Sequence, residues 1–339
     1  MAILTSGGDA PGMNGVIRAA ARTGFSLGWE VLGVADGFRG LISERFRALS
    51  DRGVGGILHR GGTILGTARA PEFEMPEGQG AAVEALERTG IDALVIVGGE
   101  GSLKGALRLQ ELGVPTVGVP ATIDNDVYGT DVAIGVDTAL NTALEAIDRI
   151  KDTASSHRRA HIVEVMGRRC GYLALTSAVA GGAEAVLVPE LEPNPENILE
   201  ALKLSYERGK PHFIVVAAEG AALSANRFHE YVNSVAGTFE ARLTVLGYVL
   251  RGGSPTAYDR LLGSRFGAAA VEALAGRQTG VMVGASGGRT GTRALADVAA
   301  RAPGLDEETY ELAMTLSGLR TSTPHREHWT SPHRRRTDD

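Results

Sequence analysis

The sequence predicts an α/β fold in which short parallel strands alternate with helices. Short apolar runs alternate along the chain with longer segments of helical periodicity, an order typical of parallel α/β sheets. The run 93–97 is apolar throughout and has turn signals on both sides, as expected of a central parallel strand. Glycine pairs follow several of these runs, and close approach of the backbone to ligands explains them better than flexible linkers.

The bulk properties indicate an ordinary globular protein. A chain of 339 residues is long enough for two compact units, and its 43% hydrophobic and 22% charged residues are typical of this class. We expect a cytoplasmic protein, because no run could span a bilayer, the start lacks a signal peptide, and a single cysteine excludes an internal disulfide framework. The net charge of −6 argues against a general nucleic-acid binder.

The predicted strands are short apolar runs that end at glycine, proline or polar residues. We expect strands at 2–4, 31–35, 93–97, 116–119, 161–165, 185–188, 213–217, 243–250 and 281–283, and helices at 15–23, 79–88, 103–112, 137–151 and 263–274. Asp137 is placed to cap the helix that it begins. The buried face of that helix is predicted to carry Leu140, Leu144, Ile147 and Ile150.

The segment 5–14, Thr-Ser-Gly-Gly-Asp-Ala-Pro-Gly-Met-Asn, joins the first predicted strand to a helix. A glycine-rich turn at a helix start suits a phosphate group, because free N–H groups and the helix dipole favour an anion. The spacing matches neither Walker A nor GxGxxG, so a purely structural turn stays an alternative. Arg18 and Arg22 lie four residues apart on the helix and form either a basic pair for a ligand or an ordinary solvated face.

The segment Gly-Gly-Glu-Gly-Ser at 98–102 repeats this arrangement after the central strand. Glu100 stands between glycines with no apolar role, which makes it a candidate magnesium carboxylate. The segment 60–69 is rich in glycine and hydroxyl groups and ends in Arg69. Arginine suits bidentate phosphate contact, so Arg69 is a candidate for it, with a plain surface residue as the alternative.

Polar side chains follow the strand at 116–119 directly. The strand stops at Pro120, which cannot donate to a ladder, and Thr122, Asp124 and Asp126 come next. Residues two apart in extended backbone point to the same side, at the strand end where open α/β sheets bind ligands. A carboxylate here could act as a general base or hold a metal, and a polar turn is the alternative. Together with the two glycine loops, this loop predicts one anion-binding site.

Other catalytic patterns are missing from the sequence. It contains no Ser/His/Asp triad signature, no zinc-ligand spacing and no basic stripe with interleaved aromatic residues. Cys170 is better explained as a small packing residue than as a nucleophile. Further strand ends carry charged residues instead: Arg168 after 161–165, Glu219 after 213–217 and Arg251 after 243–250.

Taken together, these motifs resemble those of the phosphofructokinase family, in particular its bacterial ATP-dependent type. The motifs that carry the resemblance stand in the family's order and spacing: TSGGDAPGMN, RGGTILGTAR, IVGGEGS, PATIDND, SSHRRAHIVEVMGR, AEG and EARLTVLGYVLRGGSPTAYDR. They cover residues 1 to about 285. The resemblance implies two Rossmann-like three-layer α/β/α domains with mainly parallel sheets and an active site in the cleft between them.

The resemblance implies transfer of the γ-phosphoryl group of Mg-ATP to the 1-hydroxyl of fructose 6-phosphate, a step of glycolysis that yields fructose 1,6-bisphosphate and ADP. Asp124 would be the general base, supported by Thr122, Asp126 and Arg168, and Glu100 would hold Mg²⁺. The residues matching the family's ATP site are Gly8, Arg69, Ala70, Gly99, Glu100, Gly101 and Ser102. The residues matching the sugar-phosphate site are Thr122, Asp124, Arg159, Met166, Gly167, Arg168, Glu219, Arg242, Tyr248 and Arg251, with Arg159 and Arg242 reaching it from a neighbouring subunit.

Several positions bear on the phosphoryl donor and the substrate. Gly101 and Ala121 stand where pyrophosphate-dependent members carry aspartate and lysine, which favours ATP. Glu100 replaces the family's usual aspartate, while Tyr248 and Leu250 stand where histidine and glutamine are common. The alternatives are a pyrophosphate-dependent or altered-substrate relative, and a catalytically weak regulatory or binding subunit. The 98–102 loop is also similar to one in NAD and lipid kinases, which explains none of the arginine motifs.

The resemblance further implies a homotetramer with an effector site for ADP or phosphoenolpyruvate between subunits. The residues that match that site are Arg18, Arg22, Lys151, Glu184, Arg208, Lys210 and His212, whereas Asp51 and Gly56 depart from it. No nucleic-acid or membrane partner is expected. We expect an ATP-binding domain at 1–136 plus 251–300, a fructose-6-phosphate-binding domain at 137–250 plus 301–320, and a disordered tail at 321–339.

Overall fold

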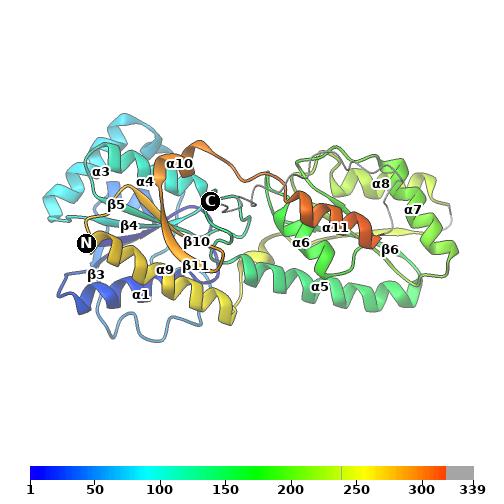
Figure 1. Ribbon diagram of the computed structural model, residues 1–339, viewed down its shortest axis with the longest axis horizontal. Helices are drawn as coiled ribbons and strands as arrows, with labels where there is room; N and C mark the ends of the chain where they lie inside the picture. The colour runs from blue at the N-terminus through cyan, green and yellow to red at the C-terminus, as the bar shows by residue number, and fades with distance from the viewer. Residues whose placement is uncertain (238, 318–339) are drawn as a thin grey trace, which may run out of the picture.

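The chain forms two α/β units that lie side by side along its longest axis (Figure 1). The computed structural model describes residues 1–237 and 239–317, so the tail predicted at 321–339 lies outside the described residues. The described strands form a seven-stranded sheet of order β11-β10-β5-β4-β1-β2-β3 and a four-stranded sheet of order β7-β8-β6-β9. The predicted α/β class with mainly parallel sheets is confirmed. The predicted domain boundaries stay a proposal.

The larger sheet has a parallel centre and antiparallel edges. Its strands are β1 (Ala2–Thr5), β2 (Leu32–Val34), β3 (Phe46–Ala48), β4 (Leu94–Gly98), β5 (Thr116–Pro120), β10 (Val281–Ser286) and β11 (Arg289–Ala294). Strands β3 and β11 pair antiparallel to their neighbours, and the other pairs are parallel. Every residue of β1, β4 and β5 is buried, which explains why their sequences are apolar rather than alternating.

Helices cover both faces of the larger sheet. Ile3 and Val97 pack with α1 (Met13–Ser26) and α9 (Ala257–Ala275) on one face. On the other face, Leu4 packs with α2 (Gly37–Ile42), α3 (Pro76–Thr89), α4 (Glu100–Glu111) and α10 (Leu295–Ala300). Helices α1 and α9 approach closely, because a Cβ added at Gly267 would lie 2.5 Å from the carbonyl oxygen of Val16. This layering brings the N-termini of α1 and α9 together at one edge.

The smaller sheet consists of parallel strands only. Its strands are β6 (Ala160–Val165), β7 (Ala185–Leu187), β8 (Phe213–Ala218) and β9 (Ala241–Val245). Helices α5 (Val136–His157) and α6 (Tyr172–Ala180) cover one face, and α7 (Pro195–Glu207) and α8 (Ala225–Val235) cover the other. Helix α11 (Glu307–Ser317) packs against α6. Short 3₁₀ segments, η1 (Pro71–Glu74) and η2 (Gly247–Arg251), lie in the loops.

The predicted strand at 243–250 is wrong in its second half. Strand β9 ends at Val245, and Gly247 follows with a left-handed φ of 54°, so the chain turns into η2. Tyr248 and Leu250 therefore lie on a 3₁₀ turn, where Tyr248 is 77% exposed and Leu250 is fully buried. A short apolar run indicates that its residues are buried but does not distinguish a strand from another buried segment, so the run to Leu250 predicted a strand.

The predicted cap of the long helix is also wrong, although its start is displaced by only one residue. Helix α5 is capped by Gly135 in a left-handed conformation, and Asp137 lies within its first turn. The side chain of Asp137 instead accepts a hydrogen bond of 2.5 Å from Thr256 Oγ1. Of the predicted stripe only Ile147 is fully buried, and the small residues Ala139 and Ala143 share its face.

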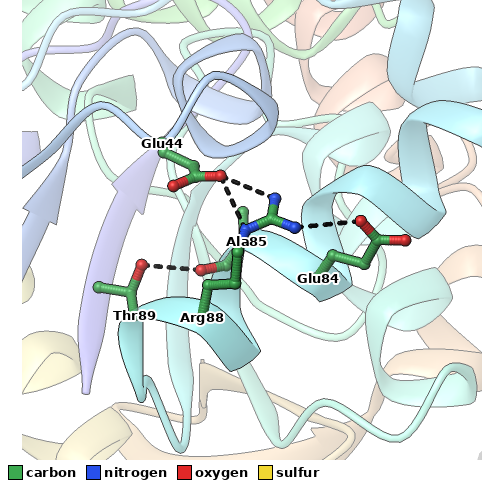
Figure 2. Close-up of polar contacts among 5 residues, drawn as sticks. All are labelled: Glu44, Glu84, Ala85, Arg88 and Thr89. Carbon is green, nitrogen blue, oxygen red and sulfur yellow. Dashed lines mark hydrogen bonds and ion pairs between the residues drawn. The ribbon is translucent and has the colours of Figure 1, made fainter.

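The end of α3 is tied to the loop after α2 by Arg88 (Figure 2). Arg88 Nε and Nη2 donate to Glu44 Oε1 at 3.0 and 2.7 Å, and Nη1 donates to Glu84 Oε2 at 3.2 Å. These hydrogen bonds raise the pKa of Arg88. Thr89 Oγ1 donates to the Ala85 carbonyl, so side-chain hydrogen bonds stabilise the last turn of α3.

Among the described helices, none combines the length and the apolar character that a membrane crossing requires.

Candidate active site

Three loops meet at the carboxyl ends of β1, β4 and β5. A Cβ added at Gly98 would lie 2.5 Å from Ser102 Oγ and 2.4 Å from the Ser6 carbonyl oxygen, so only glycine fits there. Ser102 Oγ is also 3.2 Å from the Cβ position of Gly7. The two glycine loops predicted as phosphate sites are therefore in contact, and the second begins α4 directly after Gly99.

The segment 60–69 folds over the first glycine loop. Thr67 Oγ1 donates to the Gly7 carbonyl at 2.7 Å, and Thr5 Oγ1 donates to the Gly66 carbonyl at 2.9 Å. The Arg69 side chain is exposed at the end of this segment, and its carbonyl accepts a hydrogen bond from Arg39. Ala70 follows as the residue before η1. Arg69 and Ala70 thus follow the part of the segment that contacts the first glycine loop, and neither is buried.

The loop after β5 holds Asp124 in a buried position. Asp124 is 4% exposed, and its backbone N–H donates to Thr122 Oγ1 at 3.2 Å. Asn125 adopts a left-handed φ of 52°, and its side chain accepts from the Ala133 N–H at 2.9 Å and donates to the Asp131 carbonyl at 3.1 Å. The sequence alone indicated no role for Asn125, although asparagine is one of the few side chains that tolerate this conformation. Asn125 fixes the loop that presents the two aspartates.

The charge environment of Asp124 suits a base near neutral pH. Burial and the neighbouring charge of Asp126 raise the pKa of Asp124 to about 6, and Glu219 adds to this rise. Arg251 and Arg168 oppose it. One oxygen of Asp124, Oδ1, is buried and has no hydrogen-bond partner among the described residues. An unpartnered buried oxygen of this kind is available to a ligand.

Asp126 and Glu100 form the carboxylate pair that could hold a metal. Burial raises the pKa of Asp126, the charge of Glu100 raises it further, and Asp126 Oδ1 is buried without a partner among the described residues. Glu100 Oε1 accepts from Lys104 Nζ at 2.5 Å. The described residues hold no cluster of three or more potential metal ligands. Two neighbouring carboxylates match the ligands of Mg²⁺, which binds through one or two carboxylates together with substrate phosphates.

The smaller unit contributes the loop after β6. Gly167 has a φ of 149°, and an added Cβ would lie 2.5 Å from the Cys170 carbonyl oxygen. Arg168 follows with a left-handed φ of 50°, and its N–H donates to Glu219 Oε1 at 3.1 Å. Met166, which directly precedes this turn, is buried. The hydrogen bond to Glu219 holds Arg168 in this strained backbone conformation. Strained residues of this kind cluster at active sites.

Cys170 lies in the same loop and is a packing residue. Its side chain is 8% exposed, and burial raises the pKa of its thiol to about 11. A thiol with this pKa is almost entirely protonated at neutral pH and is a poor nucleophile.

Arg251 reaches the site from η2. A Cβ added at Gly8 would lie 3.1 Å from Arg251 Nη1, so the guanidinium rests on the first glycine loop. Its other side faces the Tyr248 ring, with 5.3 Å between the guanidinium carbon and the ring centroid. Arg251 therefore connects the first glycine loop, Asp124 and the exposed ring of Tyr248.

Arg159 and Arg242 lie elsewhere. They precede β6 and begin β9, whereas Arg168 follows β6, so they occupy the opposite end of the smaller sheet from Asp124. Both pair with Glu240, Arg159 Nε at 3.1 Å from Oε2 and Arg242 Nη2 at 2.7 Å from Oε1. The structure does not bring these two arginines to the site of the same chain.

A sequence model of the family described as phosphofructokinase matches residues 1–274. This chain belongs to the phosphofructokinase family. It is 49% identical over 315 residues to the ATP-dependent 6-phosphofructokinase of Natranaerobius thermophilus, covering 93% of this chain and 98% of the relative. It is 50% identical over 317 residues to that of Listeria welshimeri, covering 94% and 99%.

Solved structures are similar as well. Pichia pastoris phosphofructokinase in the T-state superposes with a TM-score of 0.83 at 35% identity, covering 94% of this chain and 36% of that one. Phosphofructokinase from Saccharomyces cerevisiae gives a TM-score of 0.82 at 32% identity, covering 94% and 46%. A pyrophosphate-dependent phosphofructokinase from Marinobacter aquaeolei shares the fold, with a TM-score of 0.80 at 23% identity over 91% of this chain and 85% of that one.

The residues predicted for an effector site fall into two separate groups. Arg18 and Arg22 lie on α1, where Arg22 Nε pairs with Asp51 Oδ1 at 3.1 Å. Asp51, which departs from the family pattern, thus neutralises one of these arginines. The second group lies on the smaller unit: Lys151, Glu184, Lys210 and His212, with Arg208 at the end of α7. In that group Lys210 pairs with buried Glu184, and Ser155 Oγ is 2.9 Å from His212 Nδ1.

Proposed function

We propose that this chain is an ATP-dependent 6-phosphofructokinase that phosphorylates the 1-hydroxyl of fructose 6-phosphate. The observation that carries the proposal is Asp124, a buried carboxylate whose pKa is raised to about 6. It stands within the field of Arg168 and Arg251 and beside two contacting glycine loops. About 50% sequence identity to ATP-dependent 6-phosphofructokinases over nearly the whole chain supports ATP as the phosphoryl donor and fructose 6-phosphate as the acceptor.

The residues divide the work of phosphoryl transfer. Asp124 accepts the proton of the 1-hydroxyl as the bond from that oxygen to the γ-phosphorus forms, and ADP departs with the electron pair of the broken P–O bond. The N–H groups of the glycine loops and the start of α4 bind the donor's phosphates. Arg251 and Arg168 stabilise the negative charge that gathers at the transferred group.

Mg²⁺ is part of the proposal. Glu100, with Asp126 beside it, would hold the ion, which when bound neutralises charge on the donor's phosphates. The residues of this chain then have the tasks of orienting the acceptor and holding its proton. Glu219 serves the orientation by fixing the backbone of Arg168.

Arg159 and Arg242 are proposed to act on a neighbouring subunit of a homotetramer. Their position at the far end of the smaller sheet and their shared partner Glu240 support this, because two guanidinium groups held by one carboxylate keep a net positive charge. Such a pair matches the 6-phosphate of the sugar. We also propose that ADP or phosphoenolpyruvate binds where the two groups of effector residues meet across subunits, and that the enzyme works in the cytoplasm.

A donor panel tests the proposed function. Purified protein is assayed for fructose 1,6-bisphosphate with ATP, GTP or pyrophosphate, each with Mg²⁺ and with fructose 6-phosphate. Activity with ATP that is lost in Asp124→Asn supports the proposal. Activity with pyrophosphate alone would assign the donor to the alternative, which the replacement at Glu100 motivates. Tight ligand binding without turnover would instead indicate a regulatory subunit.

A further inference from the structure

Helices α5 and α9 begin next to one another, and side chains from each helix bond to the start of the other. Asp259, in the first turn of α9, accepts hydrogen bonds of 2.8 Å from the backbone N–H groups of both Gly135 and Thr138. In return Asp137, in the first turn of α5, accepts from Thr256 Oγ1, the N-cap residue of α9. The free N–H groups at the start of α5 are therefore satisfied from a distant helix rather than from a local cap.

Thr138 completes this network. Its Oγ1 donates to Asp259 Oδ2 at 2.5 Å and accepts from the Thr256 N–H at 3.1 Å. Asp259 is fully buried; burial raises its pKa, and the hydrogen bonds from Thr138 and Gly135 oppose that rise. A buried network in which donors and acceptors are matched holds its members in one arrangement, because any shift leaves a buried group unpaired.

The network stands between two parts of the active site. Gly135 directly follows Ile134, whose carbonyl accepts from the Thr122 N–H and whose N–H donates to the Pro120 carbonyl, both at 3.1 Å. The start of α5 is thus fastened to the strand end that presents Asp124. On the other side Thr256 follows the η2 segment, which carries Arg251. The junction therefore connects the strand end before Asp124 with the segment after Arg251.

The first glycine loop packs on the same junction. A Cβ added at Gly12 would lie 2.6 Å from Ile134 Cγ2 and 3.2 Å from the Asp259 carbonyl oxygen. A Cβ added at Gly135 would lie 2.7 Å from Ala10 Cβ. Glycine is required at both places, where φ is 110° and 103°, so the backbone segments touch without intervening side chains.

We propose that Asp259 is a positioning residue for the phosphoryl transfer. Through Gly135 and Thr138 it fixes the position of the Asp124 loop relative to the segment that carries Arg251. The expected effect on the reaction rate rests on the proposed function. The geometry rests on the hydrogen bonds of Asp259 to Gly135 and Thr138. Asp259 acts through these neighbours, so it affects the rate of the reaction rather than the affinity for the nucleotide.

The chain offers matched variants to test this. Asp259→Asn keeps the shape but turns an acceptor into a donor facing an N–H group. Thr138→Val keeps the volume and removes the hydroxyl, whereas Thr138→Ser restores it. Thr142→Val is the control, because among residues 1–237 and 239–317 the one hydrogen bond of Thr142 Oγ1 goes to the Thr138 carbonyl of its own helix. All variants are assayed below their melting temperatures with ATP and fructose 6-phosphate.

We expect Thr138→Val and Asp259→Asn to lower kcat about tenfold or more, because small misplacements of reacting groups cost this much. The KM for ATP should change less than about twofold, and Thr138→Ser and Thr142→Val should stay close to the unmodified protein. Equal kcat in all variants, or losses that only follow the unfolded fraction, would overturn the proposal.

Amide hydrogen exchange gives a readout that needs no turnover. Thr138→Val should speed exchange in the segments 121–134 and 247–256, and Thr142→Val should not. Should the unmodified protein lack phosphofructokinase activity, the proposed function fails, and hydrogen exchange alone tests whether Asp259 holds the two segments together. Unchanged exchange in both segments would show that Asp259 does not hold them together.

Discussion

Gly8 and Arg251 are in direct contact: a methyl group at Gly8 would lie 3.1 Å from Arg251 Nη1 and 3.2 Å from its central carbon. The first glycine loop therefore serves as the surface on which the guanidinium rests. Since Arg251 lowers the pKa of Asp124, the position of this one side chain influences the proposed base.

Gly8→Ala is expected to displace Arg251 and lower kcat/KM for fructose 6-phosphate about tenfold. The acidic limb of the pH profile should also shift to higher pH, because loss of a nearby positive charge raises the pKa of Asp124. Steady-state kinetics between pH 5 and pH 9 measure both effects. Gly80→Ala is the control, because a Cβ there meets nothing within 4 Å and the helix α3 tolerates alanine. A normal profile for Gly8→Ala would contradict the expectation.

Asp124→Asn should remove activity and stabilise the fold. Loss of a general base typically lowers kcat about 10²–10⁴-fold. The pKa of Asp124 rises from its ordinary value of 3.8 to about 6, so the folded protein binds the proton more tightly than the unfolded chain. Stability then falls as pH rises through this window, and above it the charged group costs on the order of 2–3 kcal/mol.

Urea unfolding at pH 7.5 and at pH 4 measures this effect. At pH 7.5 Asp124→Asn should be more stable than the unmodified protein, and at pH 4 the difference should shrink, since the carboxyl is then largely neutral in the folded state. Equal stability at pH 7.5, or a gain that is larger at pH 4, would show that the carboxylate is not destabilised by its surroundings.

Glu100 and Lys104 form an ion pair one helical turn apart, and this pair should set the demand for magnesium. Glu100→Gln should raise the Mg²⁺ concentration for half-maximal activity, while Lys104→Met should lower it about two- to fivefold, because the carboxylate then loses its competing cation. Titration of activity with Mg²⁺ at fixed ATP measures both. Arg149→Met, which breaks the comparable pair with Glu145 on α5, should leave the curve unchanged.

The fold class and the family could be predicted from the sequence, because both rest on local order. Strand, glycine loop and helix recur in sequence, and the fully buried β1, β4 and β5 match their apolar runs. The capping of α5 could not be predicted, because Asp259 accepts hydrogen bonds from its first N–H groups from a helix far along the chain, while the local pattern favours Asp137 as the cap. Tertiary contact overrode a local preference there.

The candidate site shows the same division. The sequence predicts Thr122, Asp124 and Asp126 on one face of an extended backbone, but the chain bends at 123–124 and Asn125 is left-handed. The three groups are close all the same, since Asp124 N–H donates to Thr122 Oγ1 and the charge of Asp126 raises the pKa of Asp124. Their individual roles stay predictions. The contributions of Asn125 and Asp259 were missed, because each acts through backbone groups that only the folded chain brings within reach.

Tyr248 should act on the reaction through Arg251. The guanidinium lies 5.3 Å from the ring centroid, and the ring is 77% exposed, so the attraction belongs to the weaker class of about 0.5–1 kcal/mol. Tyr248→Ala should therefore lower kcat/KM for fructose 6-phosphate about two- to fivefold, while Tyr248→Phe, which keeps the ring, should stay near the unmodified value. If Phe proves as harmful as Ala, the hydroxyl rather than the ring is what the substrate meets. Comparison of the two variants at saturating ATP separates these outcomes.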